Sequence, residues 1–275
     1  MNEEQIHAIN EQVAASAFSQ QAVHFDETYS GDTIIQYKRQ RVRDHVIRQL
    51  PGNGSILELN AGTGEDAVYF ARQGYRVHAT DIAAGMLDVL RTKAQREGVK
   101  DRITTECCSF TALQDLRNSG PYDLVFSNFA GLNCTGELYK TLHSLPGLLK
   151  PDGRVTLVLL PPFCLWETLL VFRGKFRTAF RRWFSGRGVS AHVDGHYFRC
   201  WYYHPSYIIR NLQDSFDLLS VEGLCTIVPP SYMEHFAEKH PKVYRILRDK
   251  EDRWKSKWPW KYIGDYYIIS LKKRG

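Results

Sequence analysis

Residues 56–66 read Ile56-Leu57-Glu58-Leu59-Asn60-Ala61-Gly62-Thr63-Gly64-Glu65-Asp66, and this stretch decides the fold of the chain. A short apolar run leads into a turn with two glycines, and a helical pattern follows directly. Such a turn brings backbone N–H groups and a helix N-terminus close to a bound ligand, because glycine leaves room for the approach. The stretch therefore predicts a strand, a ligand-binding loop and a helix, in that order.

Short apolar runs and longer helical patterns alternate on both sides of this loop. The runs that predict strands are 55–59, 76–80, 102–107, 122–127, 154–160, 216–221 and 266–271. The patterns that predict helices between them are 65–73, 84–98, 137–149 and 206–212. This alternation is typical of βαβ units. We therefore expect an α/β fold with a Rossmann-like, doubly wound sheet of seven mostly parallel strands.

Two regions fall outside this rhythm. Residues 1–50 predict two helices, the second opening after Asp32 and ending at Pro51. The alternation also fails after Pro162 and resumes near Pro205. We therefore divide the chain into an N-terminal helical cover (1–50), a core (51–162 and 205–275) and a helical lid insertion (163–204). The aromatic stretch 230–262 predicts a second excursion before the last strand.

The charges around the glycine loop restrict the ligand. A dinucleotide-binding loop carries a third glycine, but Ala67 occupies that position. The acids Glu58, Glu65 and Asp66 would repel a pyrophosphate and suit a ligand that bears a positive charge. Asp81 ends the next expected strand, where a carboxylate can accept hydrogen bonds from both hydroxyls of a ribose.

These motifs resemble those of the class I S-adenosylmethionine-dependent methyltransferases. The glycine loop of that family, E-x-x-x-G-x-G in its core, is similar to Glu58 to Gly64, and its ribose-binding acid is similar to Asp81. Asn60 stands where many members have their first glycine. The resemblance spans about residues 22–160 and the final strands. It implies that the chain is an enzyme with S-adenosyl-L-methionine as its cofactor and S-adenosyl-L-homocysteine as the product.

The resemblance also implies roles for individual residues. Glu58 and the loop would hold the amino-acid end of the cofactor, whereas Met86 and the Ser109-Phe110 segment would contact adenine. The strand end at Asn128 would face the transferred methyl group. The full set of expected cofactor-binding residues is Tyr29, Glu58, Asn60, Gly62, Gly64, Asp66, Asp81, Ile82, Met86, Ser109, Phe110, Asn128 and Phe129. For Tyr29 and Met86, ordinary core packing is the competing interpretation.

The insertion carries the surplus charge of the chain, whose formal net charge is +6. Six cations occur there with no acid among them: Arg173, Lys175, Arg177, Arg181, Arg182 and Arg187. Apolar residues spaced by three or four, from Leu165 to Trp183, predict one helix that continues through Gly174. This helix is either a lid with a solvated basic face or a roof whose arginines attract an anionic acceptor, a carrier or a membrane surface. Nucleic acid is disfavoured, because the aromatics share the apolar face.

Two histidines of the insertion are candidates for catalysis. His192 or His196 could deprotonate a hydroxyl acceptor at neutral pH if the insertion hangs over the fourth strand. A structural loop histidine is the competing interpretation for each. They have no third ligand at a recognised spacing, so we expect no metal site.

The prediction from sequence is methyl transfer to a small or medium apolar or aromatic acceptor, which is anionic or lipid-like, with O-methylation preferred. Two alternatives stay open: a protein or RNA methyltransferase that uses the basic lid for recognition, and a non-catalytic module that binds the cofactor. Ser127-Asn128-Phe129 differs from the N-P-P-Y signature of enzymes that methylate exocyclic amines. Six scattered cysteines, read as reduced thiols, and a first segment unlike a signal peptide predict a cytoplasmic protein.

Overall fold

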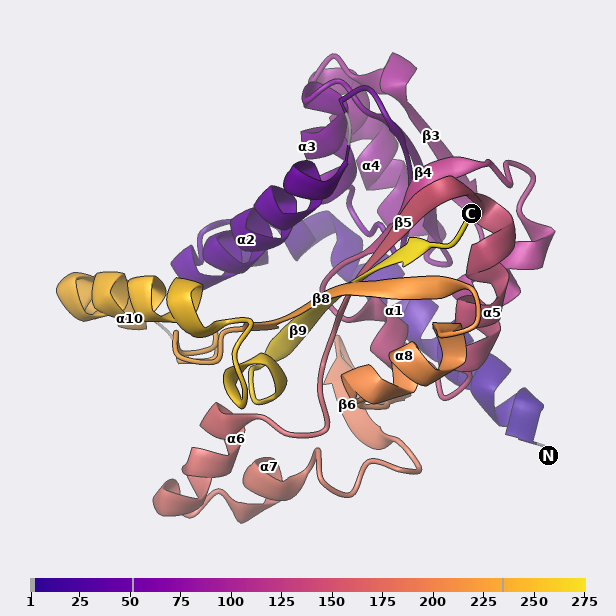
Figure 1. The fold of residues 1–275 in the computed structure, drawn as a ribbon. Coiled ribbons are helices and arrows are strands. Elements are labelled where there is room, and N and C mark those ends of the chain that lie inside the picture. The colour runs from indigo at the N-terminus through magenta and orange to yellow at the C-terminus, as the bar shows by residue number, and fades with distance from the viewer. Residues whose placement is uncertain (1–2, 51, 234) are drawn as a thin grey trace.

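A seven-stranded sheet forms the centre of the computed structural model (Figure 1), which describes residues 3–50, 52–233 and 235–275, without the side chains of 3 and 28–30. The strand order is β3-β2-β1-β4-β5-β9-β8. The strands are β1 (Ser55–Leu59), β2 (Arg76–Asp81), β3 (Ile103–Cys107), β4 (Tyr122–Ser127), β5 (Leu149–Leu159), β8 (Phe216–Leu224) and β9 (Tyr266–Lys273). The first five are parallel, and β9 is antiparallel to both neighbours. The expected Rossmann-like sheet is confirmed.

Helices cover both faces of the sheet. One face packs against α2 (Thr33–Gln49), α3 (Glu65–Arg72) and α4 (Ala84–Arg96), and the other against α5 (Leu138–Leu148) and α8 (Pro205–Leu212). Successive residues of β1 alternate between the two cores, with Ile56 in the first and Leu57 and Leu59 in the second. Burial on both faces explains why these strands read as continuous apolar runs.

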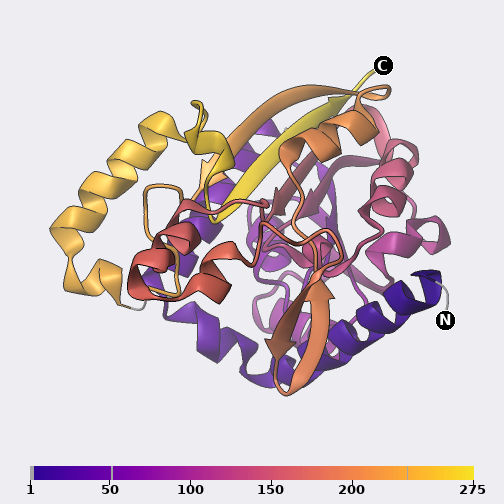
Figure 2. The same ribbon diagram turned by 90° about the horizontal axis from the view of Figure 1, so that it is seen from below.

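The N-terminal region forms the two expected helices, α1 (Glu3–Ser30) and α2. Asp32 caps α2, because its carboxylate accepts hydrogen bonds from the backbone N–H groups of Ile34 and Ile35 at 2.8 Å. α1 packs against α4 and the hairpin of β6 (Val189–Val193) and β7 (His196–Cys200), and Figure 2 shows it running along that hairpin. The two helices thereby enclose the carboxyl ends of the central strands.

The insertion differs from the single helix that we expected. It contains α6 (Leu165–Leu169), the 3-10 turn η4 (Leu170–Arg173), α7 (Phe176–Phe180) and a hairpin of β6 (Val189–Val193) and β7 (His196–Cys200). The prediction that the helix continues through Gly174 is wrong: Gly174 adopts the left-handed conformation, with φ at 70°, and ends the helical run. The hairpin turns at Asp194-Gly195, where both φ angles are positive. An Asp-Gly pair favours such a two-residue turn, so this signal was present in the sequence.

The remaining elements complete the edges of the fold. They are η1 (Lys100–Arg102), η2 (Phe110–Asp115), η3 (Gly131–Cys134), α9 (Phe236–Lys239), α10 (Pro241–Trp254) and η5 (Trp260–Tyr262). The Glu251 carboxylate on α10 accepts hydrogen bonds from four successive backbone N–H groups, those of residues 225–228, and so anchors α10 to the end of β8. No helix in the described ranges is long and apolar enough to cross a membrane.

Candidate functional site

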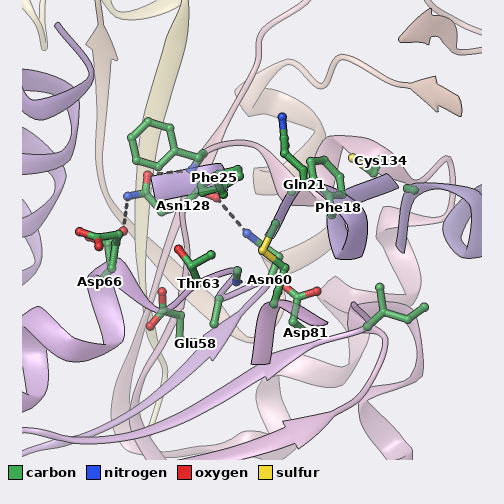
Figure 3. A pocket seen from close by; sticks show the side chains of 18 of the residues that line it. Phe18, Gln21, Phe25, Glu58, Asn60, Thr63, Asp66, Asp81, Asn128 and Cys134 are labelled. Carbon is green, nitrogen blue, oxygen red and sulfur yellow. Dashed lines mark hydrogen bonds between the residues drawn. The ribbon is translucent and has the colours of Figure 1, made fainter. Parts of the chain in front are cut away.

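A cavity of about 330 Å³ lies at the carboxyl ends of β1, β2 and β4, beneath α1 and α2. Figure 3 shows Glu58 and Asp66 at one end of it, Asp81 at the other, and Asn60 and Thr63 between them. Parallel sheets bind their ligands at this edge, where the strand order reverses. The expected cofactor residues that line the cavity are Glu58, Asn60, Gly62, Asp66, Asp81, Ile82, Met86, Phe110, Asn128 and Phe129.

The two loop glycines have different roles. A Cβ on Gly64 would lie 2.3 Å from Cγ of Leu90 on α4, so this glycine permits two helices to pack closely. A Cβ on Gly62 would meet nothing within 4 Å, and Gly62 lines the cavity, whereas Gly64 does not. Both have positive φ angles, 56° and 77°. Gly62 therefore keeps space for a ligand, and Gly64 sets the loop against the core.

Asn60 replaces the first glycine of the motif and ties two loops together. Its φ is 46°, which asparagine tolerates better than most residues. Its Nδ2 donates to the Asn128 carbonyl at 2.9 Å, and its Oδ1 accepts from Ser127 Oγ at 2.6 Å. A Cβ on Gly131 would lie 2.4 Å from Cγ of Asn60. A glycine at 131 thus makes room for the side chain that the loop has gained at position 60.

Asp81 lies at the end of β2 with both oxygens held by the backbone. One accepts from the N–H of Gly62 at 2.9 Å and the other from the N–H of Ala83 at 2.8 Å. Burial raises the pKa of Asp81, whereas these backbone N–H groups favour its charged form. Each carboxylate oxygen has a further lone pair, so Asp81 can still accept ligand hydroxyls.

Two of the three acids around the glycine loop, Glu65 and Asp66, are paired within the protein. Asp66 contacts Arg43 Nε at 2.7 Å, Arg39 Nη1 at 3.4 Å and Asn128 Nδ2 at 2.7 Å. Burial alone would raise the pKa of Asp66, but these partners hold it below its ordinary value. Glu65 is bound to Lys93, with Oε1 and Nζ 2.6 Å apart.

Glu58 differs from Asp66, because one of its buried carboxylate oxygens lacks a hydrogen-bond partner among the described residues. It is 3% exposed, and its Oε2 has no hydrogen-bond partner among the described residues. Burial and the neighbouring charge of Asp66 raise the pKa of Glu58 well above its ordinary value. A cationic ligand group would satisfy this oxygen and favour the charged form.

Two cations of α2 also line the cavity, and the sequence analysis missed both. Arg39 is buried above the Phe129 ring, 4.7 Å from its centroid, and its Nε has no hydrogen-bond partner in the described part of the chain. Lys38 Nζ lies 3.2 Å from Ser231 Oγ and 3.7 Å from Asp265 Oδ2. The only signal in the sequence was a cation-rich helix, which normally indicates a solvated face.

The aromatic end of the cavity follows β4. Phe129 and Ala130 both have positive φ angles, an uncommon conformation that aims Phe129 towards Tyr266, 6.2 Å away between ring centroids. Phe129 N–H donates to Asn128 Oδ1 at 2.8 Å. Burial raises the pKa of Tyr266, so its hydroxyl stays neutral. This end combines two aromatic rings with the ammonium of Lys38, 4.8 Å from the Tyr266 ring.

Several expected site residues lie elsewhere. Ser109 Oγ donates to Glu11 Oε2 at 2.7 Å, and Glu11, from α1, lines the cavity in its place. His196 Nε2 lies 3.0 Å from Gln20 Oε1, and His192 lies against the Tyr197 ring, 4.5 Å between centroids. Neither histidine lines the cavity. Tyr29 belongs to α1, but its side chain lies outside the described residues.

Three side chains of types that can ligate a metal ion lie close together. Atoms of Cys164, Glu167 and Asp265 lie within 4.8 Å of one another. The Arg182 guanidinium binds both carboxylates, at 2.7 Å from Glu167 and 2.8 Å from Asp265. An arginine already satisfies these acids, so we assign them a structural role.

Comparisons with known proteins agree with this geometry. A family model described as a methyltransferase domain matches residues 56–153. The demethylmenaquinone methyltransferase of Leptospira interrogans is 28% identical over 117 residues, 40% of this chain and 46% of the relative. The S-adenosyl-L-methionine-dependent Diels-Alderase iccD of Talaromyces variabilis is 33% identical over 113 residues, 40% of this chain and 37% of the relative. The chain thus matches less than half the length of these relatives.

Solved structures share the fold over more of the chain. The structure of a putative sarcosine dimethylglycine methyltransferase from Galdieria sulphuraria superposes with a TM-score of 0.60 and 13% identity. The superposition covers 93% of this chain and 98% of that one. At this identity the similarity establishes the fold and leaves the acceptor open.

Proposed function

This chain contains a class I S-adenosylmethionine-dependent methyltransferase domain, and from that premise we propose that it methylates an acidic hydroxyl of a small or medium aromatic or lipid-like acceptor. The observation that carries the proposal is the cavity, in which buried polar atoms without partners lie beside a group of aromatic and cationic side chains.

The residues present fit the cofactor. Asp81 would accept the ribose hydroxyls, and Met86, Ile82 and Phe110 would contact adenine. The open Glu58 oxygen suits the ammonium of the amino-acid end, and the unpartnered Nε of Arg39 suits its carboxylate. When bound, the cofactor supplies a methyl group already activated on a sulfonium sulfur.

The protein then needs to orient the acceptor and exclude water. Phe129 and Tyr266 would hold an aromatic or apolar body at the end of β4. Burial alone would lower the pKa of Lys38, but neighbouring groups, the Asp265 carboxylate among them, outweigh this and raise it to about 12. Lys38 therefore stays charged at neutral pH and would stabilise an acceptor oxyanion rather than remove its proton. An acceptor hydroxyl that ionises readily, such as a phenol or an enol, fits this site without a histidine base.

Calorimetry with S-adenosylmethionine tests the cofactor assignment. Asp81→Ala should weaken binding about a hundredfold, because two hydrogen bonds to a charged group are lost. Asp101→Ala, at an exposed acid of η1, should leave the affinity unchanged. Absence of binding to the unaltered chain, or equal affinity in Asp81→Ala, would contradict the proposal.

A panel of phenols, enols and quinols, assayed by release of S-adenosylhomocysteine, tests methyl transfer. Turnover with an acidic hydroxyl, lost in Lys38→Met but kept in part in Lys38→Arg, is the expected result. Cofactor binding without turnover on any acceptor of this panel would favour the non-catalytic module, and turnover only on RNA or protein would favour those alternatives.

A further inference from the structure

The basic lid, which we define as residues 165–187, exposes several large aromatic side chains to solvent. Phe172 is 85% exposed, Phe184 81%, Phe176 59% and Trp183 51%. Figure 1 shows α6 and α7 together at the lower left of the molecule, away from the sheet. Large apolar groups gathered on one exposed segment indicate an interaction surface.

The cations of the basic lid divide into two sets. Arg182 is buried and binds Glu167 at 2.7 Å, and Arg181, which is 43% exposed, binds the same carboxylate at 2.6 Å. The outward set is exposed and forms no ion pair within the described chain: Arg173, Lys175, Arg177 and Arg187. The sequence has no acid between Glu167 and Asp194. The outer side of the basic lid is thus both aromatic and uniformly positive.

We propose that the basic lid is a docking surface for a membrane that contains anionic lipids. Aromatic side chains insert at the boundary between headgroups and acyl chains, while cations beside them attract anionic headgroups. A second copy of the chain is a poor occupant, because two such surfaces would bring like charges together. The docking stands independently of the proposed methyl transfer.

The inner side of the basic lid connects this surface to the cavity. Arg182 binds Asp265 at 2.8 Å, and Asp265 in turn lies 3.7 Å from Lys38 at the aromatic end of the cavity. A protein docked through the basic lid would hold the cavity close to the bilayer. If the proposed function holds, this arrangement suits an acceptor that is taken from the membrane.

Co-sedimentation with vesicles tests the docking directly. The unaltered chain should bind vesicles of phosphatidylcholine with phosphatidylglycerol and bind pure phosphatidylcholine far more weakly. Raising the salt from about 0.1 M to about 0.5 M should weaken binding, because exposed charges are screened. No binding to the anionic vesicles at low salt would overturn the proposal.

Replacing exposed aromatics separates insertion from simple charge attraction. The double variant Phe172→Ser/Phe184→Ser should bind anionic vesicles at least about tenfold more weakly. Its matched control is Leu218→Ser/Leu219→Ser, which removes exposed apolar residues from β8, an edge strand of the sheet. Equal loss in both double variants would contradict a role specific to the basic lid.

Charge reversal tests the electrostatic part. Three outward cations are replaced: Arg173→Glu, Lys175→Glu and Arg177→Glu. The control reverses three exposed cations near the amino ends of β2 and β3: Arg76→Glu, Arg96→Glu and Lys100→Glu. The first set should reduce vesicle binding about a hundredfold and the control far less, although both change net charge equally.

Two further measurements keep the outcome interpretable. Urea unfolding should give each variant the same midpoint as the unaltered chain, which excludes misfolding as the cause of lost binding. Sedimentation velocity should show no self-association that depends on Phe172 and Phe184. Self-association through these residues, without vesicle binding, would overturn the membrane proposal in favour of a second copy.

Discussion

The floor of the cavity and its cover are held in place by different interactions. On the floor, backbone groups fix the geometry: the Gly62 N–H binds Asp81, and the Ala61 N–H donates to the Thr80 carbonyl at 2.9 Å. The cover, which here means α1, α2 and the insertion (163–204), is held by ion pairs between side chains distant in sequence. Lys93 binds Asp26 of α1 at 2.6 Å, for example.

The floor therefore positions a ligand precisely, whereas the cover can change with its side chains. Backbone contacts between neighbouring strands place a ligand within a narrow range, since strand register allows little movement. Buried ion pairs hold a cover strongly only while both partners are present, because an unpaired buried charge is costly. The floor therefore suits a constant cofactor, and the cover can differ with the acceptor.

The largest expected effect is a loss of stability when an ion-pair partner in the cover is removed. Arg182→Met leaves the buried carboxylates of Glu167 and Asp265 without their shared partner. We expect a loss of about 3 to 5 kcal/mol in the free energy of unfolding, measured by urea denaturation. Arg187→Met, at an exposed arginine of the same segment, should change it by less than about 0.5 kcal/mol. Similar values for both would mean that the inward pairs contribute little.

The floor was predictable from the sequence because its signals are local. A strand, a glycine turn and a helix lie within residues 55–72, and Asp81 ends the next strand along. Each signal depends on residues a few positions apart, so spacing alone located the loop. The close packing of the Asn60 side chain against Gly131 was not predictable, because the two residues belong to separate loops.

The cover was predicted in outline and missed in detail. Its apolar spacing suggested one helix, but spacing cannot report that inward ion pairs to Glu167 fold α7 back beside α6 after Gly174. The cavity-lining roles of Lys38 and Arg39 were missed for the same reason, because their partners lie far along the chain. The division of the chain into an N-terminal helical cover (1–50), a core (51–162 and 205–275) and an insertion (163–204) stays a prediction.

The next effect tests the floor with the two glycines of the loop, Gly62 and Gly64. Gly64→Ala combines a left-handed φ with a Cβ 2.3 Å from Leu90, so we expect a loss of about 3 kcal/mol in unfolding free energy. Gly62→Ala has the φ strain without the clash and should lose about 1 kcal/mol. Calorimetry should show the opposite ranking for S-adenosylmethionine, because Gly62 lines the cavity and Gly64 does not. Equal stability losses would contradict the division of roles.

A smaller effect concerns pH. The pKa of Glu58 is raised in the folded chain, so Glu58 takes up its proton at a higher pH than an ordinary carboxyl group. Because the charged form is the one that would bind the cofactor ammonium, affinity should fall as the pH falls through this raised pKa. Glu58→Gln should weaken binding about tenfold at neutral pH and flatten the dependence. An equally steep dependence in the variant would assign it to another group.

The smallest expected effect concerns the hairpin at the margin of the cover. A general base removed from an enzyme costs about a hundredfold to ten-thousandfold in rate. His192 and His196 lie off the cavity, in contact with Tyr197 and Gln20, so His192→Ala and His196→Ala should each keep kcat/KM within about twofold. The measurement is S-adenosylhomocysteine release with an acceptor found in the panel. A loss near a hundredfold in either variant would mean that the hairpin closes over the acceptor during turnover, and the cover would then supply chemistry as well as enclosure.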